Sequence, residues 1–134
     1  EFANAVLGAK LIVVLGHSKC GAIKGACDHI EMGNLTELLS KIQPAVYQET
    51  ETTIDRNATN PQFVENVSII NVKRSVRNII ERSYVLEQLL ESGAIGIVGA
   101  MHNIETGKVT FYDDVTFIKD EINPDFSFAK VRSN

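Results

Sequence analysis

The side chains best suited to chemistry in this chain are a histidine and a cysteine that stand close together in the sequence. His17 and Cys20 lie three residues apart, directly behind the apolar run at residues 11–15 and just before Gly21. Imidazole nitrogen and thiolate sulfur are the ligands that zinc prefers, and open α/β folds gather their chemistry at the carboxyl ends of strands. The pair therefore indicates a metal site at a sheet edge, against the alternative of a buried structural cysteine beside a partly exposed histidine.

Three further residues are candidates for a third metal donor, and the sequence supports each of them poorly. Cys27 lies seven residues past Cys20, which is about 10 Å along a helix, whereas a zinc–sulfur bond is about 2.3 Å long. Cys27 is therefore predicted to be a core residue, and His29, near the far end of the same helix, fails for the same reason. His102 follows a second apolar run and is either a donor at the sheet edge of His17 or a loop-capping or surface residue.

Other chemistries that use a similar loop each lack a required residue. Gly16 and Gly21 have the spacing of a phosphate-binding P-loop, but Ala22 and Ile23 replace its Lys and Ser or Thr. A cysteine phosphatase needs an arginine six residues after its nucleophile, where this chain has Ala26. A thioredoxin-like Cys-x-x-Cys motif is excluded because Ile23 stands where the second cysteine is needed.

Composition predicts one soluble domain spanning residues 1–134. The chain has 134 residues, 44% hydrophobic content and a net charge of −4, which is enough for a core and argues against a nucleic-acid or anionic-membrane partner. No apolar run approaches the roughly 20 residues that span a bilayer. With only two cysteines, we expect a reducing compartment, the cytoplasm. Because the chain opens on Glu1 without a methionine, we expect its true N-terminus to be missing.

The elements that must position these residues alternate between helix and strand patterns. The apolar runs indicate strands buried on both faces, typical of parallel sheets. We expect helices at residues 2–9, 20–30, 35–43, 62–80 and 84–90, strands at 10–16, 94–101 and 109–112, a polar loop at 49–61, and a tail after Asp114 that wraps the surface or a partner. The predicted fold class is α/β, a mostly parallel sheet flanked by helices with a C-terminal antiparallel edge hairpin.

The helix expected after Gly33 has a recognisable start and a predicted buried stripe. Asn34 with Glu37 three residues later resembles a capping box. Pro44 either interrupts this helix or begins a second segment. The stripe is predicted to consist of Leu38, Leu39 and Ile42.

Three blocks of the sequence resemble the β-class carbonic anhydrases. Residues 2–22, which read FANAVLGAKLIVVLGHSKCGA, contain the His-x-x-Cys-Gly motif of that family. Residues 65–72 are similar to its long helix, and residues 95–109 to its last pair of strands. The resemblance covers nearly the whole chain, in order.

The resemblance implies a zinc enzyme that reversibly hydrates carbon dioxide to bicarbonate and a proton, assembled as a homodimer or a dimer of dimers. Zinc would be held by two cysteines and one histidine, with water or an aspartate as fourth ligand. His17 matches the zinc histidine and Cys20 the second zinc cysteine, while Gly21 and Ala22 would supply substrate-pocket backbone. The first zinc cysteine belongs to a Cys-x-Asp-x-Arg segment, whose Asp and Arg form the catalytic dyad.

That segment does not occur in these 134 residues, so no catalytic residue is predicted in this chain and we expect it to be weakly active or inactive alone. Three interpretations remain open. The chain is part of a genuine β-carbonic anhydrase, an inactive module of a larger protein such as an anion transporter, or a dimerisation scaffold. The resemblance also implies that two strands of the sheet, including the central one, belong to the missing part. The predicted strand at residues 11–16 then has an edge without its family neighbour, and such an edge invites association.

Overall fold

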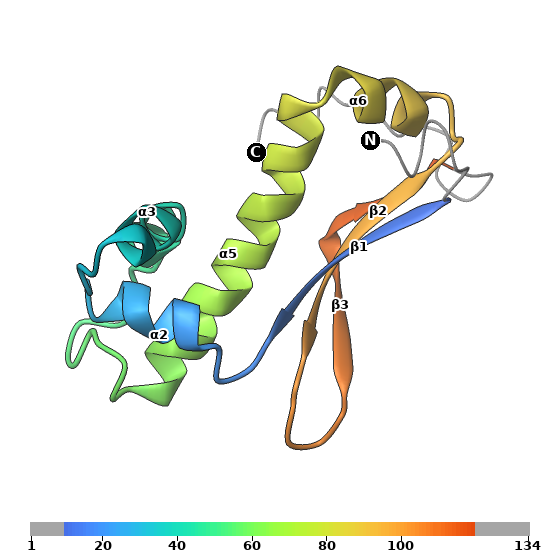
Figure 1. The fold of residues 1–134 in the computed structure, drawn as a ribbon. Coiled ribbons are helices and arrows are strands. Elements are labelled where there is room, and N and C mark those ends of the chain that lie inside the picture. The colour runs from blue at the N-terminus through green and yellow to red at the C-terminus, as the bar shows by residue number, and fades with distance from the viewer. Residues whose placement is uncertain (1–9, 120–134) are drawn as a thin grey trace. The chain divides into compact units, whose positions relative to one another are not determined.

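The computed structural model describes residues 10–119 and contains helices and strands in the order that the sequence predicts (Figure 1). The elements are β1 (Leu11–His17), α2 (Gly21–Cys27), α3 (Asn34–Ser40), α4 (Gln43–Gln48), α5 (Pro61–Arg82), α6 (Tyr84–Glu91), β2 (Gly96–His102) and β3 (Val109–Phe117). The helix expected at residues 2–9 lies outside the described residues, as does most of the predicted tail.

The three strands form one sheet in the order β1-β2-β3. The Gly96 amide donates to the Lys10 carbonyl at 2.9 Å, and at the other end the Ser18 amide donates to the His102 carbonyl at 2.9 Å. These two bonds advance together along both strands, so β1 and β2 are parallel. A short turn at residues 103–108 joins β2 to β3 and makes that pair antiparallel. The expected parallel pair with an edge hairpin is confirmed.

Burial of β1 differs from the sequence expectation. Leu11, Val13 and Leu15 are 51%, 45% and 52% exposed, whereas Ile12 and Val14 pack against a hydrophobic cluster. Successive strand residues point to opposite faces, so only one face of β1 is covered. The prediction of burial on both faces was wrong, because within residues 10–119 β1 is an edge strand and β2 is the buried central one.

The described chain groups into two compact units, which are treated separately. The first comprises residues 10–15, 73–100 and 110–119, and the second residues 16–72 and 101–109. The core of the first unit combines the end of α5 with α6 and the sheet. Its buried members are Val76, Ile80, Leu86, Leu90, Ile95, Ile97 and Val115.

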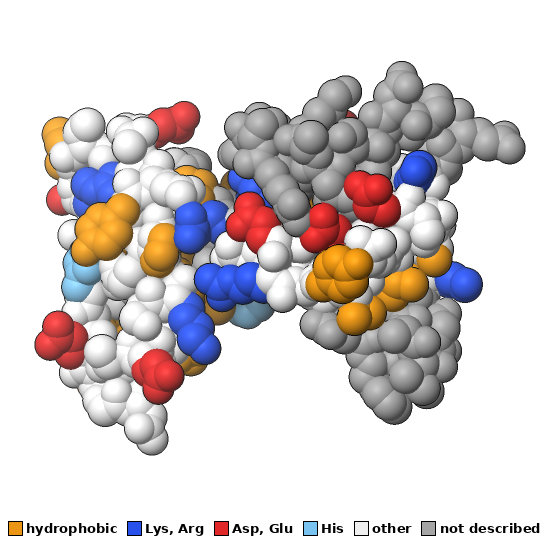
Figure 2. All heavy atoms as spheres, turned by 90° about the horizontal axis from the view of Figure 1, so that it is seen from above, with side chains coloured by type: hydrophobic (Ala, Val, Ile, Leu, Met, Phe, Trp, Pro, Cys, Tyr) orange, Lys and Arg blue, Asp and Glu red, His pale blue; other side chains and the backbone are white. Residues whose placement is uncertain are grey.

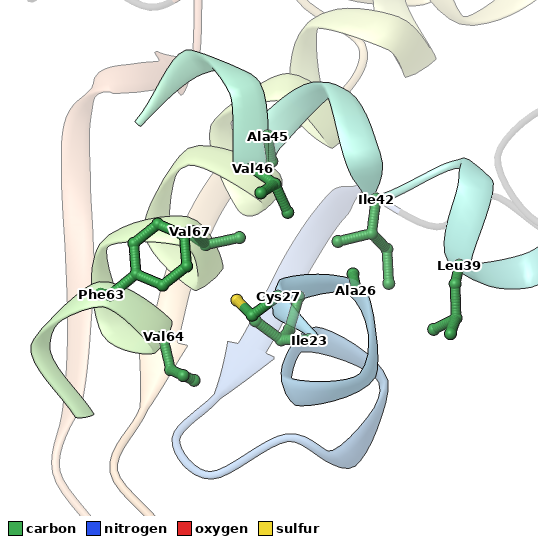
Figure 3. Close-up of a cluster of buried hydrophobic side chains, with 10 residues drawn as sticks. All are labelled: Ile23, Ala26, Cys27, Leu39, Ile42, Ala45, Val46, Phe63, Val64 and Val67. Carbon is green, nitrogen blue, oxygen red and sulfur yellow. The ribbon is translucent and has the colours of Figure 1, made fainter. Parts of the chain in front are cut away.

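The second unit has its own core, formed by α2, α3, α4 and the first half of α5 (Figure 3). Its buried members are Ile23, Ala26, Cys27, Leu39, Ile42, Ala45, Val46, Phe63, Val64 and Val67. Pro44 lies in the first turn of α4, where proline is tolerated, and so begins a second helical segment.

The start of α3 and its predicted stripe need correction. Gly33, with a φ of 50°, is the N-cap residue, and no side chain caps the helix. The capping box at Asn34 is therefore wrong, because Asn34 already lies inside the helix. Leu39 is buried as expected, but Leu38 is 51% exposed, since the helix turns it away from the core.

Two further elements differ in length from their predictions. The helix expected at residues 20–30 ends at Cys27, and His29 takes a φ of 53°, in the left-handed region that does not continue a helix. The last strand runs to Phe117 rather than residue 112, because Val115 is buried in the core of the first unit. The long helix, the short helix after it and the polar loop are confirmed.

The described surface carries charges of both signs. The face in Figure 2 shows Lys and Arg side chains together with Asp and Glu side chains and separate hydrophobic ones. No helix within residues 10–119 combines the length and the apolar character needed to cross a membrane.

Candidate metal centre

Residues 16–21, which comprise the end of β1, the connection to α2 and the first residue of α2, are called the donor loop here. His17 is the last residue of β1, and Cys20 is the N-cap residue of α2 with an extended backbone. Both candidate donors therefore lie at the carboxyl end of a strand that belongs to a parallel pair, as the sequence predicts. This is the edge at which α/β folds place binding and catalytic groups.

The imidazole of His17 is oriented by the backbone next to it. His17 is exposed, and its Nδ1 lies 2.9 Å from the carbonyl oxygen of Ser18. A carbonyl oxygen only accepts, so Nδ1 carries the proton in this bond. The lone pair of Nε2 is then available, which is the arrangement found in metal-binding histidines.

The thiol of Cys20 is half-buried and free of a disulfide. Its side chain packs against the core of the second unit. This contact holds the residue in place while part of it stays accessible. Cys20 thus combines a fixed position with the chemistry of a soft metal ligand.

Cys27 takes no part in this site. It is fully buried, and its thiol points into the core of the second unit (Figure 3). Burial raises the pKa of Cys27 to about 11, with a further contribution from the neighbouring charge of Asp28. A thiol that stays protonated among apolar side chains is a poor metal ligand, so the prediction of a core residue is confirmed.

The two remaining histidines do not complete the donor set. His29 lies beyond the end of α2 with its ring 6.4 Å from that of Tyr47. His102 ends β2, and its carbonyl accepts from the Ser18 amide, which confirms that it shares the sheet edge of His17. Within residues 10–119, no three His, Cys, Asp or Glu side chains come together as a metal site. The donors present fit zinc in type but not in number.

The two glycines of the donor loop differ in the space around them. A Cβ on Gly21 would meet no atom within 4 Å, so its predicted role toward substrate, with that of Ala22, stays a prediction. A Cβ on Gly16 would lie 2.5 Å from Val72 Cγ2 and 2.7 Å from Met101 Sδ. Packing therefore requires glycine at 16, a role that sequence reasoning missed because the contacts come from distant segments.

Sequence reasoning also missed a charged cluster in residues 49–60, called the anchor loop here. Glu49 is 2% exposed, and its carboxylate accepts hydrogen bonds from the amide and hydroxyl of Thr52 and from Asn66. Burial by itself raises the pKa of Glu49, but these hydrogen bonds outweigh it and lower the pKa overall. Glu49 is thus a buried carboxylate kept ionised by its partners.

Arg56 links the anchor loop to the preceding helix by hydrogen bonds. Its guanidinium donates to the carbonyls of Val46, Glu49 and Thr52 at 2.8–2.9 Å and lies 3.5 Å from the Glu49 carboxylate. It also lies 4.7 Å from the centre of the Phe63 ring, in cation–π range. The cluster satisfies its own polar groups, which indicates a structural role.

Comparison with known proteins shows the family of the chain. A family model described as carbonic anhydrase matches residues 1–109. Carbonic anhydrase 2 of Mycobacterium tuberculosis is 27% identical over 127 residues, covering 91% of this chain and 58% of that protein. A carbonic anhydrase of Synechocystis is 30% identical over 86% of this chain and 42% of its own length. The chain thus spans about half the length of the curated relatives it matches.

Solved structures show the same fold. A β-carbonic anhydrase of Aspergillus fumigatus matches with a TM-score of 0.71 and 26% identity, over 84% of this chain and 53% of that one. A structure described as one of two tetrameric β-carbonic anhydrases of Sordaria macrospora matches with a TM-score of 0.72 and 22% identity, over 84% of this chain and 57% of that one.

Proposed function

Because the chain belongs to the carbonic anhydrase family, we propose that it supplies part of a zinc-dependent enzyme for the reversible hydration of carbon dioxide to bicarbonate and a proton. The observation that carries the proposal is the placement of His17 and Cys20. Both flank the carboxyl end of β1, and the hydrogen bond from Nδ1 leaves Nε2 free to bind a metal.

In this proposal, His17 Nε2 and Cys20 Sγ are two of the zinc donors. Bound zinc lowers the pKa of a water molecule and so supplies a hydroxide nucleophile near neutral pH. The described residues contribute no third donor, and the 134 residues contain no Cys-x-Asp-x-Arg segment. The remaining donor and the acid–base dyad must therefore come from polypeptide other than residues 10–119.

This division of labour leaves the chain with two tasks. The donor loop presents the imidazole of His17 in the metal-binding tautomer. The core of the second unit holds Cys20, three residues further along the chain, in place. Neither task moves a proton to or from substrate. We therefore expect the chain alone to hydrate carbon dioxide weakly or not at all.

The test is stopped-flow carbon dioxide hydration by the product of the entire reading frame, compared with the 134-residue chain. We expect turnover only from the former, and its loss in the His17→Ala and Cys20→Ser variants. Cys27→Ala serves as the matched control and should stay active, provided that it folds. Turnover that survives the loss of either donor would refute the proposal.

A second candidate is an inactive, carbonic-anhydrase-like dimerisation scaffold. It is favoured by the short donor set and by the exposed apolar side chains of β1, Leu11, Val13 and Leu15. The gene sequence upstream of Glu1 separates the two candidates. A Cys-x-Asp-x-Arg segment there supports the enzyme, and its absence supports the scaffold.

The proposal extends to assembly and location. Within residues 10–119, β1 pairs only with β2, and an open strand edge with apolar side chains favours association. We therefore propose a homodimer or a dimer of dimers, which size-exclusion chromatography with light scattering tests directly. Both cysteines are free, in keeping with a reducing compartment such as the cytoplasm, which fractionation of the source cells would check.

A further inference from the structure

The turn between β2 and β3 contacts the donor loop at Ser18, the residue that follows the candidate metal ligand His17. The Ser18 amide donates to the His102 carbonyl at 2.9 Å, and the Ser18 hydroxyl accepts from the Ile104 amide at 3.0 Å. Two backbone groups on either side of one turn residue therefore hold Ser18. All these residues belong to the second unit.

The third polar group of Ser18 acts on the imidazole. Its carbonyl oxygen lies 2.9 Å from His17 Nδ1. That carbonyl belongs to the peptide unit between Ser18 and Lys19, so one backbone rotation, ψ of Ser18, separates it from the amide nitrogen that His102 holds. The bonds to His102 and Ile104 restrain the backbone and the side chain of Ser18, and through this one residue the hairpin turn is linked to the ring of His17.

An ion pair adds a weaker contact one residue further on. Lys19 Nζ contacts the carboxylate of Glu105, again joining the donor loop to the turn. Both side chains are about 60% exposed, and such pairs contribute about 0–1 kcal/mol. Lys19 also has a φ of 56°, an uncommon conformation for a residue other than glycine. The ion pair supports the loop shape, but the main restraint is at Ser18.

We propose that the β2–β3 turn, acting through Ser18, positions His17 and sets the tautomer that leaves Nε2 free for a metal. Ser18 is a positioning residue, since it acts through His17 and donates nothing to the metal itself. The part of this inference that concerns metal binding rests on the proposed function, whereas the part that concerns the tautomer of His17 does not. A hydroxyl at position 18 is required because an alanine leaves the Ile104 amide without its partner.

The test uses the 134-residue chain, metal-free, at a pH above the ordinary histidine pKa of about 6.5. Nitrogen-15 NMR of the ring, assigned with His17→Ala, reports which nitrogen carries the proton. We expect protonated Nδ1 to dominate in the natural sequence and in Ser18→Thr, which keeps the hydroxyl. Ser18→Ala should shift the population toward protonated Nε2.

A matched control removes a similar hydroxyl elsewhere. Ser92 Oγ also accepts from a backbone amide, that of Ala94, at 3.3 Å, but it lies in the first unit. Ser92→Ala should leave the tautomer of His17 unchanged. Thermal unfolding of each variant shows whether a change in tautomer reflects a local effect or loss of the fold. An unchanged tautomer in folded Ser18→Ala would overturn the proposal.

Titration with Co²⁺ then connects the tautomer to metal binding. Loss of an outer partner of a metal-binding histidine costs about 10–100-fold in affinity, so Ser18→Ala should bind Co²⁺ about tenfold more weakly, with rescue in Ser18→Thr. Equal affinity in Ser18→Ala and the natural sequence would count against the proposal. Equal affinity in His17→Ala would instead refute the proposed function while leaving the tautomer result intact.

Discussion

The donor loop and the anchor loop both carry polar side chains in the second unit, but they differ in how the protein satisfies those groups. In the anchor loop, Glu49 is buried against Thr52 and Asn66, and Arg56 donates to three carbonyls. In the donor loop, the described contacts give His17 a single backbone partner through Nδ1. Polar groups that hydrogen-bond to one another stabilise a fold, whereas a side-chain atom without such a partner is available to bind a ligand. Substitutions in the two loops should therefore separate stability from metal binding.

The largest loss of stability should follow from Arg56→Met. The change leaves three carbonyls and the buried Glu49 carboxylate without their cationic partner, so the free energy of unfolding should fall by about 3 kcal/mol. Urea denaturation followed by circular dichroism measures it. His17→Ala, the matched change in the donor loop, should alter it by less than about 0.5 kcal/mol. A similar fall in the free energy of unfolding in both variants would contradict the contrast between the two loops.

The two cysteines give the next largest contrast. Cys27→Ser places a hydroxyl in an apolar core and should cost about 2 kcal/mol, while Cys20→Ser should change stability by less than about 0.5 kcal/mol. A thiol reagent applied to the native protein at about pH 8 should modify Cys20 and spare Cys27, whose pKa is raised to about 11. Fast modification of Cys27 in the native state would contradict this account.

One position of the donor loop does depend on packing. Gly16→Ala would push a methyl group into Val72 and Met101 and should destabilise the chain by about 1–2 kcal/mol. Gly21→Ala, which meets nothing within 4 Å, should be neutral or slightly stabilising because alanine favours a helix. Thermal melts of the pair would show this difference, and a larger loss at Gly21 would argue against the described packing.

The smallest effect should appear in the pH dependence of stability. The pKa of Glu49 is lower in the folded chain than its ordinary value, so its contribution is present above the unfolded pKa of about 4.3. That contribution is lost as the pH falls through the folded pKa. The urea concentration at the midpoint of unfolding should fall as the pH is lowered from about 5 to 3, and it should fall less in Glu49→Gln. An unchanged slope would mean that Glu49 titrates normally.

Periodicity in the sequence predicts most of the elements. The helical spacing of Phe63, Val67, Val76 and Ile80 indicates α5, and the continuous apolar run of β2 indicates a central strand. Burial of β1 is less predictable, because a run such as Leu11–His17 does not say which neighbour covers each face. The helix N-cap at Gly33 is missed because Asn34 is the commoner capping residue type.

The sequence predicts those parts of the site whose residues lie close together along the chain. His17 and Cys20 are adjacent to one strand end, so the sequence alone places them together. The contacts of Gly16 with Val72 and Met101 join segments far apart in the chain, and no local pattern encodes them. The partners of Glu49 lie closer in the sequence, with Thr52 three residues away and Asn66 seventeen, but Glu49 itself reads only as one polar residue in a polar loop.

The most direct test of the central claim, that residues 10–119 supply an incomplete set of zinc donors, is the zinc content of the chain after dialysis against a chelator. We expect far less than one zinc per chain by elemental analysis, and weak rebinding that His17→Ala or Cys20→Ser abolishes. One zinc per chain that survives the chelator would contradict the account. It would require a third donor, for which His102 at the same sheet edge is the first candidate.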